Sequence, residues 1–370
     1  MLKQFEVNNI YIGEYVPPKT FTITWTEKSD MSSWWTYSDD AAGLTAGSSD
    51  FDDFFWYYGC RLSNAGAETA TVKQSSPWTL DITQLGTLTS WDNVMIAFPR
   101  RWIKMTKSWT TVTLSITEEP NKGWYQYYAH TKWSDAKNTL YLWAYKMVSW
   151  YKSLSWASPL GGLTRDEFRQ WIKSAYDSLA WTNKYSQISI YARWYINALY
   201  MMKYGNPNSQ SVIWYWNVWG TLLSTWWTNS QTSASYWTSS QTDQIKLFWL
   251  EDWWWNTCEF LDCCWIASSS HLTVDKTNSV FQDSDCSTDL WVASSWWLGW
   301  IDGSNDGMFR NVNTNWSATT YYTDYSSATS SRVPVAAYRS GYPTRLGAFS
   351  MTLAYPTTSG ATYWARLMYL

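Results

Sequence analysis

The sequence predicts an α+β domain in which two helices are set among many short strands and long polar loops. Apolar side chains recur at helical spacing in two segments only, 165–180 and 188–204. Alternation typical of half-buried strands occurs repeatedly between 93 and 116 and again in the last segment, 332–370. Helices and strands that are segregated along a chain favour an α+β fold over a parallel α/β fold.

Both helices have recognisable ends. Thr164 and Glu167 form a capping box, in which each side chain satisfies a backbone N–H of the other residue. The second helix is expected to stop at Gly205, because glycine readily adopts the left-handed conformation that ends a helix.

The strand-like segments are 21–24, 93–98, 102–105, 111–116 and 140–145. Residues 107–110 predict a hairpin turn that suits glycine better than Trp109. We divide the chain into an N-terminal strand and loop region, 1–89, and a domain over 90–370 whose outer face is 332–370. The first region includes a strand-like segment that begins near Asn9.

Composition excludes several classes of function. The chain has 370 residues and a formal charge of −3, which gives no basic field for nucleic acid. No apolar run approaches the roughly 20 residues that a membrane span needs. The first residues lack the apolar core of a signal peptide, so none is expected. We therefore predict no nucleic-acid partner and no membrane insertion.

Tryptophan usage is abnormal, with 33 tryptophans against 17 glycines. Many tryptophans lie in Ser/Thr/Asn/Asp-rich turns, as in 31–36, 224–229 and 314–317, where positive φ and therefore glycine is favoured. We hypothesise that most of them are UGA codons that the natural host reads as glycine. The alternative is a tryptophan-rich carbohydrate binder whose indoles stack on sugars.

Two clusters resemble metal sites. Cys258, Cys263, Cys264, His271 and Cys286 lack the paired Cys-x-x-Cys spacing of zinc sites, so buried free thiols or one disulfide is the favoured interpretation. The segment 302–307 resembles half of a calcium loop, but Asn313 replaces the bidentate Glu. Asp50, Asp52 and Asp53 are interpreted as a solvated turn. We predict no cofactor and no metal.

Catalytic constellations are absent from the sequence pattern. His130 and His271 have undistinguished contexts, and no Gly-x-Ser-x-Gly elbow occurs. The nearest group of carboxylates is Glu251, Asp252, Glu259 and Asp262, for which loop and cap roles are favoured over glycoside hydrolysis. We therefore predict that the protein is not an enzyme.

A family resemblance appears once the turn tryptophans are read as glycine. The segment 247–260 becomes Leu-Phe-Gly-Leu-Glu-Asp-Trp-Trp-Gly-Asn-Thr-Cys-Glu-Phe. It resembles the Gly-(Leu/Ile)-x-(Asp/Asn)-x-x-Gly-Asn-x-x-Glu-Trp signature of the formylglycine-generating-enzyme-like branch of the C-type lectin fold. The segments 208–214, 321–325, 332–338, 347–349 and 364–367 follow the family's order. Ala336, Ala337 and Arg339 depart from its Gly-Gly-x-Trp pattern.

The resemblance implies a C-type lectin fold with two helices, short twisted antiparallel strands and long loops over 90–370. Relatives of this layout are phage tail receptor-binding proteins and the variable proteins of diversity-generating retroelements. The segment 9–13 also resembles the attachment strand of phage structural proteins, which implies that the region 1–89 attaches the protein to the virion. Since the chain has no cysteine after Cys286, sulfatase-activating chemistry is not expected.

The same resemblance implies which residues face a ligand. Phe349, Met351, Leu353 and Leu367 are the expected scaffold. Rigid Tyr and adaptable Ser or Thr side chains suit a recognition surface. The expected exposed, ligand-binding positions are Tyr338, Arg339, Ser340, Tyr342, Thr344, Ser350, Thr352, Ala354, Tyr355 and Thr362. An ordinary two-sided sheet is the structural alternative.

The expected function is that of a phage tail-fibre or tail-tip adhesin in the virion, which binds a host surface receptor, protein or glycan, and contacts other tail proteins. Fibres of this kind are often homotrimers, although no sequence feature specifies one. The alternatives are a cellular surface adhesin of the same fold, and a glycan-cleaving tail enzyme that uses Glu251 or Asp252 as acid or base.

Overall fold

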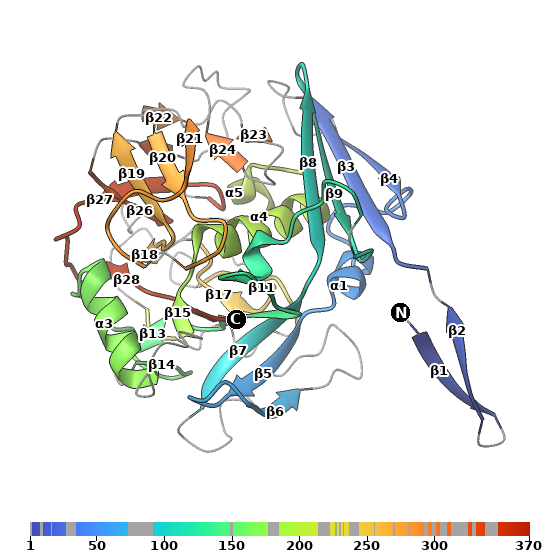
Figure 1. Cartoon of the computed structure of the whole chain (residues 1–370), viewed down its shortest axis with the longest axis horizontal. Coiled ribbons are helices and arrows are strands. Elements are labelled where there is room, and N and C mark those ends of the chain that lie inside the picture. Colours follow the sequence, from blue (N-terminus) through green and yellow to red (C-terminus); the bar gives the residue numbers. More distant parts are fainter. Residues whose placement is uncertain are drawn as a thin grey trace.

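A computed structural model of the chain is largely β-sheet, with four α-helices in the described residues (Figure 1). It describes residues 2–7, 10–15, 17–26, 35–72, 92–120, 122–148, 151–176, 185–213, 223–225, 228, 231, 233–236, 244–254, 256–268, 271–279, 281–291, 295–297, 301–303, 309–311, 325–327, 331–336 and 347–370. The predicted α+β class is confirmed at this coarse level. Among the described residues, no helix has both the length and the apolar character to cross a membrane.

Two large antiparallel sheets contain strands from both sides of residue 90. One has the order β15 (Tyr185–Gln187), β29 (Leu367–Tyr369), β12 (Thr139–Trp143), β7 (Asn93–Pro99), β5 (Tyr58–Leu62) and β6 (Glu68–Val72). The other has the order β4 (Trp35–Asp39), β3 (Thr20–Thr26), β9 (Thr111–Thr117) and β8 (Trp102–Ser108). Residues 20–72 thus share two sheets with the region after residue 90, whereas the sequence-based division placed a boundary between them.

All strands of a third sheet come from the last third of the chain. Its order is β22 (Ser295–Trp297), β25 (Tyr325–Ser327), β27 (Met351–Ala354), β26 (Val333–Ala336), β18 (Cys258–Phe260) and β28 (Tyr363–Trp364). Beside it lies a three-stranded sheet of β19 (Cys264–Ser268), β20 (His271–Val274) and β21 (Thr288–Trp291).

The remaining strands form short hairpins. They are β1 (Leu2–Val7) with β2 (Ile10–Tyr15), β10 (Thr131–Lys132) with β11 (Asp135–Ala136), β13 (Met147–Val148) with β14 (Lys152–Ser153), β16 (Lys246–Leu247) with β17 (Leu250–Glu251), and β23 (Ile301–Gly303) with β24 (Phe309–Asn311).

Both predicted helices are present. α3 (Arg165–Tyr176) begins with the expected capping box: the Glu167 carboxylate accepts from the Thr164 N–H at 2.7 Å, and Thr164 Oγ1 accepts from the Glu167 N–H at 3.2 Å. α4 (Ile190–Tyr204) is capped by the Ser189 side chain, and Gly205 ends it with φ 64°. The sequence analysis missed two shorter helices, α1 (Asp50–Phe55) and α5 (Ser209–Val212), and a 3₁₀ turn, η1 (Tyr128–His130).

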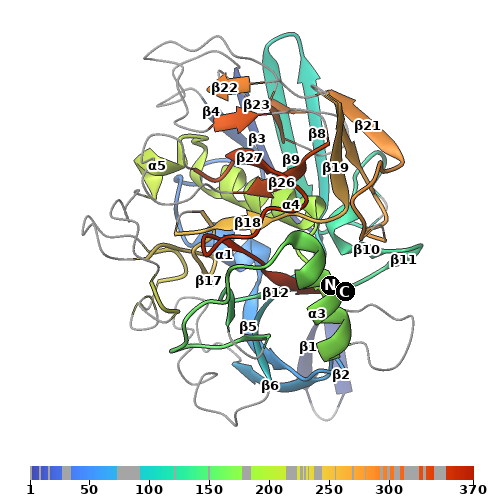
Figure 2. The same cartoon turned by 90° about the vertical axis from the view of Figure 1, so that its left-hand side faces the viewer.

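α4 is the centre of the molecule, and every one of its residues is buried. A helix that is buried all round belongs to a core. In both views it lies among the sheets (Figures 1 and 2). Its polar contacts reach three distant segments: Tyr195 donates to Pro99 O at the end of β7, Asn197 donates to Ala348 O, and Lys203 pairs with the buried Asp52 of α1.

Tryptophans at positive φ form a distinct group. Among the described residues, six of the fourteen non-glycine positions with positive φ are Trp56, Trp109, Trp124, Trp133, Trp156 and Trp249. The first five are more than half exposed, and Trp109 is 94% exposed. Left-handed backbone costs an L-residue about 1–2 kcal/mol, and an exposed indole gains little packing to offset that cost.

The predicted hairpin supports the hypothesis that tryptophans in turns stand for glycine. Ser108 and Thr111 pair across the turn between β8 and β9, so Trp109 and Thr110 form a two-residue loop. Trp109 has φ 57° at its first position, where such a turn favours glycine. By contrast, Trp253 is fully buried and its indole N–H donates to Asn197 Oδ1 at 3.0 Å, as expected of a genuine tryptophan.

Candidate functional site

The third sheet buries part of the predicted ligand-binding face. Ser350, Thr352 and Ala354 are only 4%, 7% and 4% exposed, so the expectation that they face solvent is wrong. Thr352 and Ala354 belong to β27, an interior strand that pairs with β26 on one side and β25 on the other, and residues on both of its faces are buried; Ser350 directly precedes this strand. Alternation predicts exposure only where one face of a sheet is solvated.

The expected scaffold is mostly confirmed. Phe349, Met351 and Leu367 are buried, and the Phe349 ring meets Tyr200 of α4 edge-on with centroids 6.0 Å apart. Leu353 is only partly buried, against the core cluster.

The exposed part of the predicted face is the loop 355–362, which joins β27 to β28. Tyr355 is 58% exposed, and the Arg332 guanidinium carbon lies 3.5 Å from the centre of its ring. Thr362 is partly exposed. Tyr338, Arg339, Ser340, Tyr342 and Thr344 lie outside the described residues. The described surface of the face is therefore an arginine–aromatic stack beside a Thr/Ser-rich loop.

Backbone contacts fix both ends of this loop. A turn closes on Tyr355, whose carbonyl accepts from the Thr358 N–H at 2.9 Å. At the other end, the Gly162 N–H donates to Gly360 O at 3.0 Å and the Cys258 N–H donates to Thr362 O at 2.9 Å. A loop with anchored ends and exposed side chains loses little conformational entropy when it binds a partner.

Directly behind the loop, a charge cluster is fully buried. Glu259 Oε2 accepts from Lys146 Nζ at 2.7 Å and from Arg366 Nε at 3.3 Å. Arg366 also donates to the carbonyls of Trp143, Ala144 and Glu251, and so joins β12, β17 and β18 to the C-terminal segment. Burial alone would raise the pKa of Glu259, but Lys146 and Arg366 outweigh it and hold the pKa at about 2.

The carboxylates of the enzymatic alternative are enclosed. Glu251 is 2% exposed, and its Oε2 accepts from the Thr228 hydroxyl at 2.8 Å. Asp252 is equally buried and accepts from the amides of Gln244 and Asn256 at 2.7 and 2.8 Å. Burial raises the pKa of Asp252 to about 6. These internal partners and the low exposure count against acid–base chemistry on an external glycan.

The other sequence-predicted clusters have ordinary surroundings. Cys258, Cys263 and Cys264 are buried thiols, and Cys286 is partly buried. His130 is buried, and burial lowers its pKa to about 3. In the described part of the chain, no three His, Cys, Asp or Glu side chains converge as metal ligands. Most of the calcium-like segment 302–307 lies outside the described residues.

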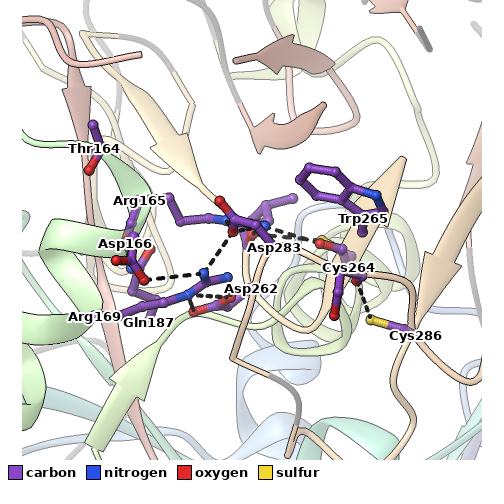
Figure 3. Close-up of polar contacts among 12 residues, drawn as sticks. Thr164, Arg165, Asp166, Arg169, Gln187, Asp262, Cys264, Trp265, Asp283 and Cys286 are labelled. Atoms are coloured by element: carbon purple, nitrogen blue, oxygen red, sulfur yellow. Dashed lines mark hydrogen bonds and ion pairs between the residues drawn. The ribbon is translucent and has the colours of Figure 1, made fainter. Parts of the chain in front are cut away.

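An ion-pair cluster beside α3 was not predicted. Asp283 Oδ1 accepts from Arg165 Nε at 2.9 Å and from Arg169 Nη1 at 2.7 Å, and Arg169 Nε donates to both oxygens of Asp262 at 3.1 Å (Figure 3). Arg165 also donates to the carbonyls of Leu261 and Cys264. The partners are about a hundred residues apart in sequence, so no local pattern indicated that they would meet.

Comparisons with known proteins leave the family open. No family model matches the chain, and a search of curated proteins found no match.

Proposed function

We propose that the protein is an adhesin of a phage tail fibre or tail tip, which binds a host surface receptor through its C-terminal face. The observation that carries this proposal is the exposed Tyr355–Arg332 stack on a loop whose ends are anchored. Tyrosine and arginine are enriched at binding hot spots, because they combine contact area with hydrogen bonding. The C-type lectin resemblance of the sequence supports the same function, and the receptor is a protein or a glycan.

The structure changes the composition of the proposed face. Ser350, Thr352 and Ala354 are removed from it because they are buried. Tyr355 and Thr362 remain, together with the predicted positions Tyr338, Arg339, Ser340, Tyr342 and Thr344. The partners in this proposal are the host receptor and virion tail proteins, and the location is the virion tail.

Adsorption tests the face directly. Tyr355→Ala should weaken binding of the purified protein to host cells by about 1–3 kcal/mol, the usual range for a hot spot. Trp171→Ala removes an aromatic side chain that is 42% exposed on α3, away from this loop, and serves as the control. If Tyr355→Ala and Tyr342→Ala both bind like the parent protein, the proposed face is wrong.

Three observations distinguish the proposed function from its alternatives. The genes beside this one distinguish a phage adhesin from a cellular surface adhesin of the same fold. A nearby reverse transcriptase with a near-identical template repeat would show that 338–363 is diversified. Cleavage of host glycans that Glu251→Gln abolishes would establish the enzyme instead.

We also propose that Trp56, Trp109, Trp124, Trp133, Trp156 and Trp249 stand for glycine in the natural protein. Their positive φ supports this proposal, and the exposure of five of them adds to it. Mass spectrometry of the protein made by its natural host, which should show glycine at these six positions, is the deciding measurement.

A further inference from the structure

The ion pair between Lys203 and Asp52 lies inside the protein, where the last turn of α4 meets α1. Lys203 is 4% exposed and Asp52 is 3% exposed, and Lys203 Nζ lies directly against Asp52 Oδ2. The buried Tyr57 hydroxyl donates to the other carboxyl oxygen, Oδ1, at 2.7 Å. An amine and a carboxyl group from distant parts of the chain are therefore held in contact.

Aromatic rings surround this pair. Lys203 Nζ lies 5.5 Å from the ring centre of Tyr204 and 5.9 Å from that of Phe248. The Phe248 ring packs in turn against Tyr57, with centroids 5.3 Å apart. Among the residues that the structure describes, Lys203 is the one cation paired with Asp52. Surroundings of this kind solvate separated charges poorly.

The buried pair of Lys146 with Glu259 has a different charge balance. Glu259 also accepts from Arg366, and the two cations hold its pKa at about 2, so this carboxylate stays ionised. By contrast, burial raises the pKa of Asp52 and lowers the pKa of Lys203, although the charge of each partner opposes these shifts. The uncharged form, an amine beside a carboxylic acid, is therefore more accessible at Asp52 than at Glu259.

An amine in contact with a carboxylic acid has both reactants of an amide bond. We propose that Lys203 and Asp52 condense to an isopeptide bond, which joins α4 covalently to α1. The Lys203 ammonium passes one proton to Asp52 Oδ2, and the neutral Nζ then attacks Cγ. A second proton moves from Nζ to Oδ2, the bond between Cγ and Oδ2 breaks, and Oδ2 leaves as water. The step needs no oxidant and no other reactant.

The geometry of the site favours this condensation. Contact between the two groups replaces a bimolecular encounter, which is a large part of the barrier to such a reaction in solution. Negative charge develops on Oδ1 as Nζ attacks Cγ, and the Tyr57 hydroxyl already donates a hydrogen bond to that oxygen. The aromatic enclosure keeps out the water that would hydrolyse the bond.

The mass of the full-length chain, produced recombinantly with this sequence, tests the proposal without any substitution. Apart from removal of Met1, the mass should be lower than the sequence mass by one water molecule. Peptide mapping by tandem mass spectrometry should find one branched peptide that contains both Asp52 and Lys203. A mass equal to the sequence mass, or a water loss that maps to another residue, would overturn the proposal.

The same digest contains its own control. Lys146 and Glu259 should appear in two unlinked peptides, because Arg366 keeps that carboxylate ionised. A cross-link between Lys146 and Glu259 would overturn the argument that the charge balance selects Asp52.

Two conservative variants test the chemistry of the bond. Lys203→Arg keeps the positive charge, but a guanidinium that does not lose its proton cannot act as the amine, so this variant should have the full sequence mass. Asp52→Asn should lose ammonia instead of water and should reach the same final mass as the parent, because both acyl groups give the same amide. Circular dichroism checks that both variants fold. Water loss that persists in folded Lys203→Arg would overturn the proposal.

The isopeptide bond involves no residue of 338–363, so it goes beyond the adhesin proposal. Mass spectrometry tests the bond and cell binding tests the adhesin, and therefore either proposal can fail without the other.

Discussion

Two adjacent parts of the C-terminal segment have opposite environments. In 355–362 every side chain is exposed or partly exposed, whereas Trp364, Ala365, Arg366, Leu367 and Met368 are all buried. The first part is rich in Thr, Ser, Gly and Pro, and the second enters the central sheet as β29 between β15 and β12. One end of the chain therefore both presents a surface and secures the core behind it.

Side-chain substitutions should be tolerated better in 355–362 than in 364–368. An exposed loop held by backbone hydrogen bonds keeps its shape when its side chains change, because those bonds do not depend on side-chain identity. A buried ion cluster has no such freedom, because removal of one partner leaves a charge without compensation in a low-dielectric interior.

The largest expected effect comes from breaking the buried cluster. Glu259→Gln leaves Lys146 and Arg366 without their shared carboxylate and should lower the free energy of unfolding by about 3–5 kcal/mol. Urea denaturation measures the change. Glu167→Gln makes the same chemical change at an exposed site where Gln also serves in a capping box, and it should leave the free energy of unfolding nearly unchanged. If the two variants lost equal free energy of unfolding, the expected difference between the buried and the exposed carboxylate would be wrong.

Acid should destabilise the folded protein by protonating Glu259 in the buried charge cluster. The pKa of Glu259 is lowered from an ordinary value of 4.5 to about 2 in the folded protein. The ionised Glu259 side chain therefore contributes its full stabilisation above pH 4.5, and this contribution is lost as the pH falls from 4.5 towards 2. The total loss in the free energy of unfolding is on the order of 3 kcal/mol. Urea midpoints measured between pH 6 and pH 2 should show a shallower decline for Glu259→Gln than for the parent protein.

Replacement of tryptophan by glycine at one exposed and one buried position makes the same comparison. Trp109→Gly removes an exposed indole from a left-handed position and should raise stability by about 1–2 kcal/mol. Trp143→Gly removes a fully buried side chain and should instead destabilise, by about 3–5 kcal/mol. Thermal unfolding compares them, and destabilisation by Trp109→Gly would count against glycine as the natural residue.

The smallest expected effect belongs to the exposed loop. Tyr355→Ala should change the free energy of unfolding by less than about 0.5 kcal/mol, because Tyr355 is 58% exposed and its ring lies against the Arg332 guanidinium. Chemical denaturation in parallel with the cell-binding assay separates a loss of recognition from a loss of folding. A large destabilisation would place Tyr355 with the core instead of the surface.

Local signals in the sequence were sufficient for the two long helices and for the strands β3, β7, β8, β9 and β12. The start of α3 is marked by Thr164 with Glu167, the end of α4 by Gly205, and β9 by the alternation in 111–116. Each of these signals involves residues that are close together in the sequence, so it can be recognised without knowledge of distant partners. α1 was missed because a six-residue helix with three aspartates has weak intrinsic helix propensity and is stabilised by packing, including the pair between Asp52 and Lys203 of α4.

By itself, the sequence determined the α+β class, the two long helices, the buried scaffold around Phe349 and the unusual placement of tryptophan in turns. Only the tertiary structure decided that Ser350, Thr352 and Ala354 are buried, since strand position in a sheet depends on neighbours that come from distant parts of the chain. The ion pairs between Arg169 and Asp262 and between Arg366 and Glu259 also became known only from the tertiary structure. Ion pairs between residues about a hundred positions apart leave no periodic pattern, because their geometry is set by how the sheets pack around α4.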